Sequence, residues 1–106
     1  MRDVDLSTFV QAHAEGAVVV DVRESMEYHR AHVPGALLMP MSQIGARYTE
    51  LDRSQRLYII CATGNRSAAI TDALRHAGYD AVNVLGGTMA WMRAGYALDS
   101  GLPAAS

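Results

Sequence analysis

The chain has 106 residues, of which 50% are hydrophobic and 19% are charged, and it carries a net charge of −2. That length suits one domain with a real core. The slightly acidic balance provides no basic surface for nucleic acid or an anionic membrane. No apolar stretch approaches the roughly 20 residues of a membrane span, and the N-terminus lacks the apolar centre of a signal peptide. The predictions are a cytoplasmic domain, monomeric or weakly dimeric, with neither nucleic acid nor membrane as a partner.

Helical and extended patterns alternate along the chain. The apolar runs at 17–22 and 57–61 are typical of strands buried on both faces of a sheet. In chain order the predicted elements are a helix at 7–16, a strand at 17–22, a short helix at 24–30, a strand at 37–39, a helical segment at 42–51, a strand at 57–61, a helix at 66–77, a strand at 81–85 and a short helix ending at Gly95.

Capping residues and glycines mark several boundaries between these elements. Ser7 and Ser42 are expected to cap the helices that follow them. Gly78 stands where a glycine commonly ends a helix. Gly86 and Gly87 lack the third glycine and the lysine of a phosphate loop, so they predict a tight turn from strand into helix.

Strands that alternate with helices predict an α/β fold with a largely parallel sheet and helices on both faces. In such sheets ligands bind beyond the carboxyl ends of the strands. Cys61, the only cysteine, ends the strand that is expected to be central. Residues 1–98 are predicted to form the domain, and residues 99–106, rich in Ser, Gly, Ala and Pro, a flexible tail.

The loop after this strand reads "CATGNRS" and can form a cup around the thiol. Gly64 adopts a positive φ without strain, and Asn65 tolerates the left-handed region better than most residues. Successive amides in such a turn can point inward as an anion-binding nest, and the following helix adds the positive end of its dipole. A thiol in this cup should be shifted toward thiolate.

Side chains of the same loop add further possible hydrogen-bond donors. Those that can donate to a bound anion are Thr63, Asn65, Arg66 and Ser67. Two simpler interpretations stay open at this point. Cys61 could be a small buried apolar residue at a strand end, and Arg66 could be a solvated residue in the first helical turn. The order of strand, cysteine, glycine-bearing polar loop, arginine and helix favours a reactive thiol.

Two long segments carry a family resemblance. They are "VVVDVRESMEYHRAHVPGALLMPM" and "YIICATGNRSAAITDALRHAGYDAVNVLGGTMAWMRAGY", and they resemble a single-domain rhodanese, a sulfurtransferase, from about Val4 to Leu98. The resemblance implies a central, largely parallel five-stranded sheet with helices on both faces.

The resemblance also implies a chemistry. Cys61 would attack the sulfane sulfur of a donor such as thiosulfate and keep that sulfur as a persulfide. A thiol, cyanide or a partner protein would then accept it, with ping-pong kinetics and no metal or organic cofactor. The loop residues implied to bind the substrate are Ala62, Thr63, Gly64, Asn65, Arg66 and Ser67.

Asp21 and Arg23, in "DVRE", match family positions that are mainly structural. His29 and His32 are three residues apart, but they lack a third ligand in register for a metal site.

A second possible function of the chain is a sulfur-relay or regulatory module with little turnover on thiosulfate. A phosphatase-like enzyme is disfavoured, because only four residues separate Cys61 from Arg66 and related phosphatases have five.

Overall fold

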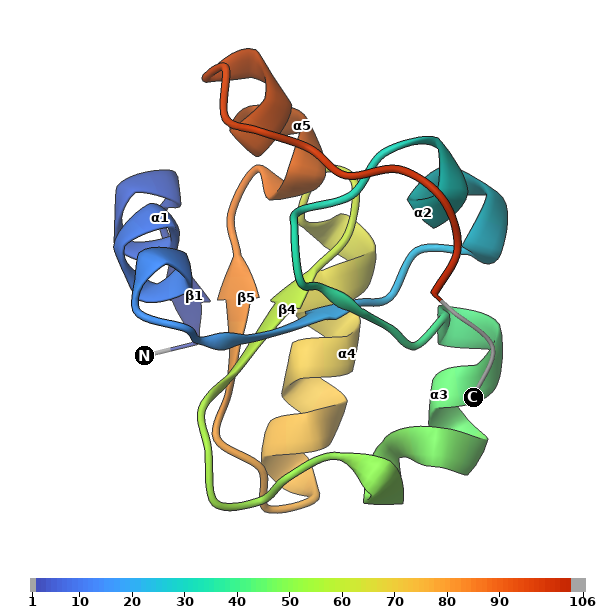
Figure 1. The fold of residues 1–106 in the computed structure, drawn as a ribbon. Helices are drawn as coiled ribbons and strands as arrows, with labels where there is room; N and C mark the ends of the chain where they lie inside the picture. Colours follow the sequence, from blue (N-terminus) through green and yellow to red (C-terminus); the bar gives the residue numbers. More distant parts are fainter. Residues whose placement is uncertain (1, 104–106) are drawn as a thin grey trace.

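The computed structural model describes residues 2–103, and its ribbon is shown in Figure 1. In chain order its elements are β1 (Asp3–Val4), α1 (Leu6–Ala14), β2 (Val18–Asp21), α2 (Ser25–Arg30), β3 (Leu37–Leu38), α3 (Met41–Arg47), the 3-10 turn η1 (Tyr48–Glu50), β4 (Leu57–Ile60), α4 (Asn65–His76), β5 (Ala81–Val84) and α5 (Gly87–Arg93). The predicted alternation of strands and helices is confirmed in type and order.

The five strands form one sheet in the order β1-β5-β4-β2-β3, with β4 at its centre. All four pairings between neighbouring strands are parallel. The predicted α/β fold is therefore confirmed. β1 has no counterpart among the predicted elements, because a strand of two residues shows no periodicity. It is held to β5 by Asn83 N donating to Arg2 O and Leu85 N donating to Val4 O.

Each face of the sheet buries its own apolar cluster. One cluster joins β2, β4 and β5 to α3 and α4, through residues that include Val20, Ile59, Ile44 and Leu74. The other joins the opposite face to α1, α2 and α5, through residues that include Phe9, Tyr28, Ile60, Val82 and Trp91. Because neighbouring residues of a strand point to opposite faces, the apolar runs serve both clusters. Helices therefore cover both faces, as predicted.

Two predicted N-caps are wrong. Helix α1 is capped by Asp5, whose Oδ1 accepts from Thr8 N at 2.9 Å, and Ser7 lies inside the helix. Helix α3 follows Pro40 directly, and Ser42 instead binds the Glu24 carboxylate through its amide and hydroxyl. In both cases the helix begins earlier than the serine suggests, and the serine side chain has an acidic partner in its own neighbourhood.

The segment after the predicted domain boundary contacts the body of the protein. Asp99 exchanges two backbone hydrogen bonds with His32, and Gly101 N donates to His29 O at 2.8 Å. Part of the predicted tail, residues 104–106, lies outside the described residues. Residues 99–103 pass beside α2, on the same end of the molecule as the loop after β4 (Figure 1).

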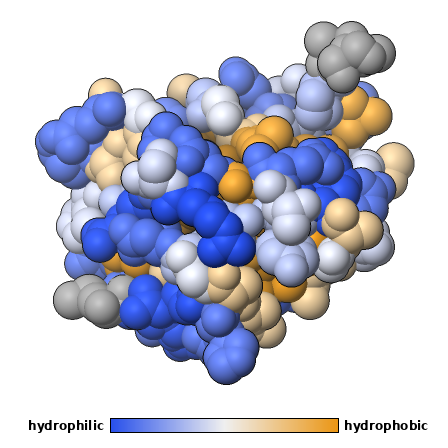
Figure 2. All heavy atoms as spheres, turned by 90° about the horizontal axis from the view of Figure 1, so that it is seen from below, coloured by the Kyte–Doolittle hydropathy of each residue, from blue (hydrophilic) through white to orange (hydrophobic). Residues whose placement is uncertain are grey.

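Figure 2 shows the end of the molecule opposite the loop after β4. Hydrophilic residues dominate this end, and apolar residues are visible only between them. Among residues 2–103, no helix is long and apolar enough to cross a bilayer.

Candidate active site

Cys61 lies directly after β4, at the carboxyl edge of the sheet. Helices α2 and α5 lie on either side of the loop that follows it, and α4 begins within that loop (Figure 1). Because β4 is the central strand, it is hydrogen-bonded to β5 on one side and to β2 on the other, and these pairings fix the strand end from which Cys61 follows. The predicted location at the end of the central strand is confirmed.

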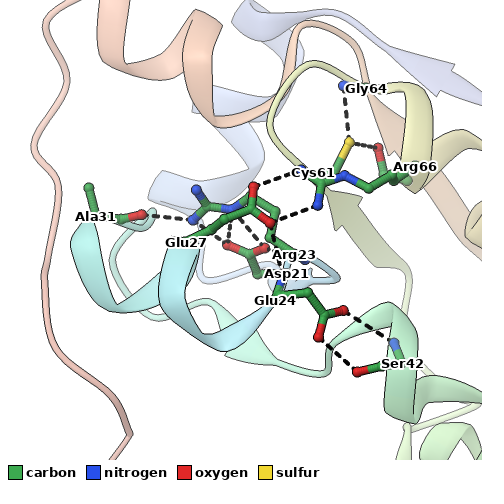
Figure 3. A network of polar contacts seen from close by, with 10 residues as sticks. Asp21, Arg23, Glu24, Glu27, Ala31, Ser42, Cys61, Gly64 and Arg66 are labelled. Carbon is green, nitrogen blue, oxygen red and sulfur yellow. Dashed lines mark hydrogen bonds and ion pairs between the residues drawn. The ribbon is translucent and has the colours of Figure 1, made fainter.

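The Cys61 thiol is enclosed by its own loop. The residue is only 1% exposed. Its Sγ accepts a hydrogen bond from Gly64 N at 3.1 Å and lies 3.2 Å from the hydroxyl of Ser67. Figure 3 shows Sγ facing the Gly64 amide. Gly64 reaches this position with a φ of 103°, in the left-handed region that glycine alone adopts without strain.

Helix α5 holds the outer side of the same loop. Thr88 N donates to Cys61 O at 2.9 Å, and Met89 N donates to Ala62 O at 3.0 Å. With these carbonyls turned outward, the amides that follow are free to turn toward Sγ. The contact requires a glycine at position 87, because a Cβ there would lie 2.6 Å from Ala62 O. The predicted glycine turn is confirmed, and it also anchors the loop.

The environment of Cys61 lowers the pKa of its thiol. Burial acts the other way and raises it, but hydrogen bonds from Ser67, Gly64 and Thr63 to the charged form outweigh the burial. The first amides of α4 contribute because they have no acceptor one turn back along the helix.

We therefore expect iodoacetamide to alkylate Cys61 at a pH where an ordinary thiol, with a pKa of about 8.5, is still protonated. The check is the alkylation rate between pH 5 and pH 9, followed by intact mass. A midpoint at the ordinary thiol value would show that the amides do not stabilise the thiolate.

Arg66 extends from α4 to Glu27 on α2. Its two terminal nitrogens donate to the two carboxylate oxygens at 2.7 and 2.8 Å (Figure 3). The two side chains are 37% and 35% exposed, so solvent screens the pair in part. The positive charge of Arg66 is therefore partly neutralised by Glu27, a partner that the sequence analysis did not identify.

The ion pair also makes the stability of the fold depend on pH. Hydrogen bonds from Arg66 lower the pKa of Glu27 from 4.5 to about 2. A depressed carboxyl pKa stabilises the fold above the unfolded value and loses this contribution as the pH falls toward 2. The pair is accordingly intact at neutral pH.

Asp21 and Arg23 form a second, buried pair behind the loop. Asp21 is fully buried, and its carboxylate accepts from Arg23 Nε and Nη2 and from the Arg23 amide. Arg23 Nη2 also donates to Ala31 O, at the end of α2, at 2.7 Å. The pair therefore ties β2 to α2, which carries Glu27. The mainly structural role of both residues stays a prediction.

The structure brings some of the predicted loop residues to the thiol and leaves others outside. Gly64 and Ser67 are buried beside it, Ala62 is half-buried, and Thr63 and Asn65 are exposed. Within the described chain, the side chains of Thr63 and Asn65 make no hydrogen bond to Sγ. Thr63 acts on the thiolate through its backbone.

Sequence reasoning missed Asn83. This residue is 1% exposed, on β5, and its amide lies between Asp3, Gly64 and Ser67. The available signal was a single polar residue inside the apolar run "AVNVL".

Over the range 2–103, no group of three His, Cys, Asp or Glu side chains is placed to hold a metal ion.

Known proteins share this sequence pattern. The profile of the rhodanese-like domain family matches residues 6–94. A sulfurtransferase of Allochromatium vinosum is 33% identical over 98 residues, which cover 90% of this chain and 92% of that protein. The Bacillus subtilis protein YrkF, for which a sulfur carrier role has been suggested, is 34% identical over 92 residues, and the chain spans 50% of its length.

Solved structures show the same fold. A rhodanese-related protein of Thermoplasma volcanium superimposes with a TM-score of 0.88 at 29% identity, covering 93% of this chain and 98% of that one. A thiosulfate sulfurtransferase of Pseudomonas aeruginosa does so with a TM-score of 0.78 at 30% identity, covering 98% of this chain and 22% of that one.

Fold and site together define an α/β protein with a thiolate-stabilising loop at the carboxyl edge of a parallel sheet. The chain belongs to the rhodanese-like domain family.

Proposed function

We propose that this chain is a sulfurtransferase that carries sulfane sulfur as a persulfide on Cys61. One observation carries the proposal: the buried Sγ of Cys61 lies within hydrogen-bond distance of the Gly64 amide and the Ser67 hydroxyl. The relatives named as sulfurtransferases or sulfur carriers support the same class of chemistry.

The transfer consists of two displacements. With thiosulfate as donor, the Cys61 thiolate attacks the sulfane sulfur, the S–S bond of the donor breaks, and sulfite leaves with the bonding electrons. The product is an enzyme-bound persulfide, Cys–S–S⁻. Cyanide or an acceptor thiolate then attacks the outer sulfur, and the Cys61 thiolate is the leaving group. Two half-reactions of this kind give ping-pong kinetics.

The loop amides would stabilise negative charge at both stages. The residues proposed to form this binding loop are Ala62, Thr63, Gly64, Asn65, Arg66 and Ser67. The Gly64 amide already faces the sulfur, and the loop amides together would stabilise the thiolate before the first displacement and the anionic outer sulfur after it, in a role like that of an oxyanion hole. A cup with four residues between Cys61 and Arg66 suits one sulfur atom better than a tetrahedral phosphate.

Glu27 is expected to restrict the use of small anionic donors, because it neutralises Arg66. Glu27→Gln should lower KM for thiosulfate roughly fivefold, since about 1 kcal/mol of partly screened attraction corresponds to that factor. Reaction with neutral iodoacetamide should change less. Glu50→Gln, which removes the exposed partner of Arg47, is the matched control. Equal changes in both variants would mean that Glu27 does not act through Arg66.

A second candidate function is a sulfur relay that passes sulfur to a protein acceptor. The suggested carrier role of YrkF favours it, and so does Glu27, which neutralises Arg66 and so removes an attraction for a dianionic donor. Both functions need the Cys61 persulfide and differ in turnover.

Steady-state thiosulfate:cyanide kinetics test the enzymatic function. Parallel double-reciprocal plots, and the formation of many molecules of thiocyanate per molecule of protein, would support the enzymatic function. A stoichiometric persulfide that cyanide empties only slowly would favour the relay. Release of phosphate from aryl phosphates, with no persulfide formed, would contradict both and point to phosphatase-like chemistry.

A further inference from the structure

The side-chain amide of Asn83 has a fixed orientation. Its Nδ2 lies 3.2 Å from Asp3 Oδ1 and 3.3 Å from Gly64 O, and both partners can only accept. The amide nitrogen must therefore face them. Its oxygen, Oδ1, faces the other way and lies 2.6 Å from the hydroxyl of Ser67. Because Asn83 is 1% exposed, this oxygen depends on Ser67 for a donor.

Ser67 has one hydroxyl proton and two neighbours that can accept it. Its Oγ lies 2.6 Å from Asn83 Oδ1 and 3.2 Å from Cys61 Sγ. A hydroxyl donates once, so it cannot satisfy both at the same time. While Cys61 is a thiol, the proton goes to Asn83 and the S–H can itself donate to Ser67 Oγ. Once Cys61 is a thiolate, the sulfur is the stronger acceptor and the hydroxyl turns toward it.

We propose that Asn83 is a positioning residue that competes with Cys61 for the single hydroxyl proton of Ser67. Ionisation of the thiol then leaves the buried oxygen of Asn83 without a donor, so Asn83 opposes ionisation and offsets part of the stabilisation that the loop gives the thiolate. The inference rests on the proposed function, in which Cys61 is the nucleophile. In the persulfide state the charge moves to the outer sulfur, and Ser67 can return to Asn83.

The charged groups near the cup come from three other elements and α4 itself. They are Arg66 on α4, Glu27 on α2, Asp21 at the end of β2 with Arg23 just after it, and Asp3 on β1. Arg66 and Arg23 are each paired with a carboxylate. Asp3 contacts the nitrogen side of Asn83, away from Ser67. The Ser67–Asn83 contact is therefore separate from the ion pairs and can be tested separately.

The test is the rate of iodoacetamide alkylation at pH 6 in a double-mutant cycle of Ser67→Ala and Asn83→Leu. Ser67→Ala should lower the rate about tenfold, because the thiolate loses a charge-assisted hydrogen bond. Asn83→Leu alone should raise it at least about threefold, because the Ser67 proton is then available to the thiolate. In the Ser67→Ala background, Asn83→Leu should have no effect.

The Asn83→Leu variant should still fold. Gly64 O also accepts from Ala68 N, and the Asp3 side chain is 33% exposed, so both keep a partner when the Asn83 amide is removed. A general change in loop shape would alter the alkylation rate equally in both backgrounds. That result, or a rate that falls or stays constant in Asn83→Leu alone, would overturn the proposal.

A second measurement needs no substitution at Asn83. In the native protein, the NMR signals of the Asn83 side-chain amide should shift with the same pH midpoint as alkylation, and in Ser67→Ala they should stay constant. Signals that titrate equally in both proteins would overturn the proposal. Alkylation reports the thiolate whether or not sulfur is transferred, so this inference and the proposed function can fail independently.

Discussion

Replacing Gly87 with alanine should destabilise the fold by about 3 kcal/mol and abolish sulfur loading of Cys61. The new Cβ would lie 2.6 Å from Ala62 O, and overpacking of this kind typically costs about 1–3 kcal/mol. The φ of 57° adds strain for any residue with a side chain. Relieving the clash would also displace the Cys61 and Ala62 carbonyls from α5. Urea unfolding and persulfide formation measure the two effects.

Gly95→Ala is the matched control for this prediction. Gly95 also has a positive φ, of 84°, but a Cβ added there would have no atom within 4 Å. Gly95→Ala should therefore lower the free energy of unfolding only through backbone strain, by about 1 kcal/mol, and sulfur loading of Cys61 should stay normal. Equal losses in the two variants would mean that α5 does not fix the loop through Gly87.

Asp21→Ala should destabilise the protein by about 3–5 kcal/mol, because it leaves the buried guanidinium of Arg23 without its counter-charge. The combined variant Asp21→Leu with Arg23→Met should recover much of this loss, since it removes both charges and fills the space. Chemical denaturation of the single and combined variants gives the comparison.

Asp80→Ala serves as the control for Asp21→Ala. It breaks the exposed pair with Arg56, in which both side chains are about half exposed, and exposed pairs contribute little. We expect almost no change in its unfolding midpoint. A similar midpoint shift for Asp21→Ala and Asp80→Ala would show that the pair behind the loop has no special role.

The fold was predictable because its main elements are continuous and strongly patterned. The apolar runs that became β2 and β4 are buried on both faces, and α4 is a helix of 12 residues that is followed closely by Gly78. What escaped prediction depends on contacts between distant residues. β1 consists of two residues that are recognisable only beside β5.

The site divides in the same way. Cys61, Gly64 and Ser67 were predictable because neighbours in one loop determine their chemistry. Glu27 was not, because it is 39 residues from Arg66 in the sequence and meets it only in the folded chain. Asn83 was missed for a similar reason, since its partners lie on β1 and in the loop before α4.

The central claim is that Cys61 accepts and releases a sulfane sulfur. Intact-protein mass spectrometry after incubation with thiosulfate tests it most directly, with Cys61→Ser as the control and cyanide added afterwards. We expect a gain of one sulfur atom on the native protein alone, and its loss on adding cyanide. An unchanged mass with thiosulfate, and also with mercaptopyruvate and polysulfide as donors, would contradict it.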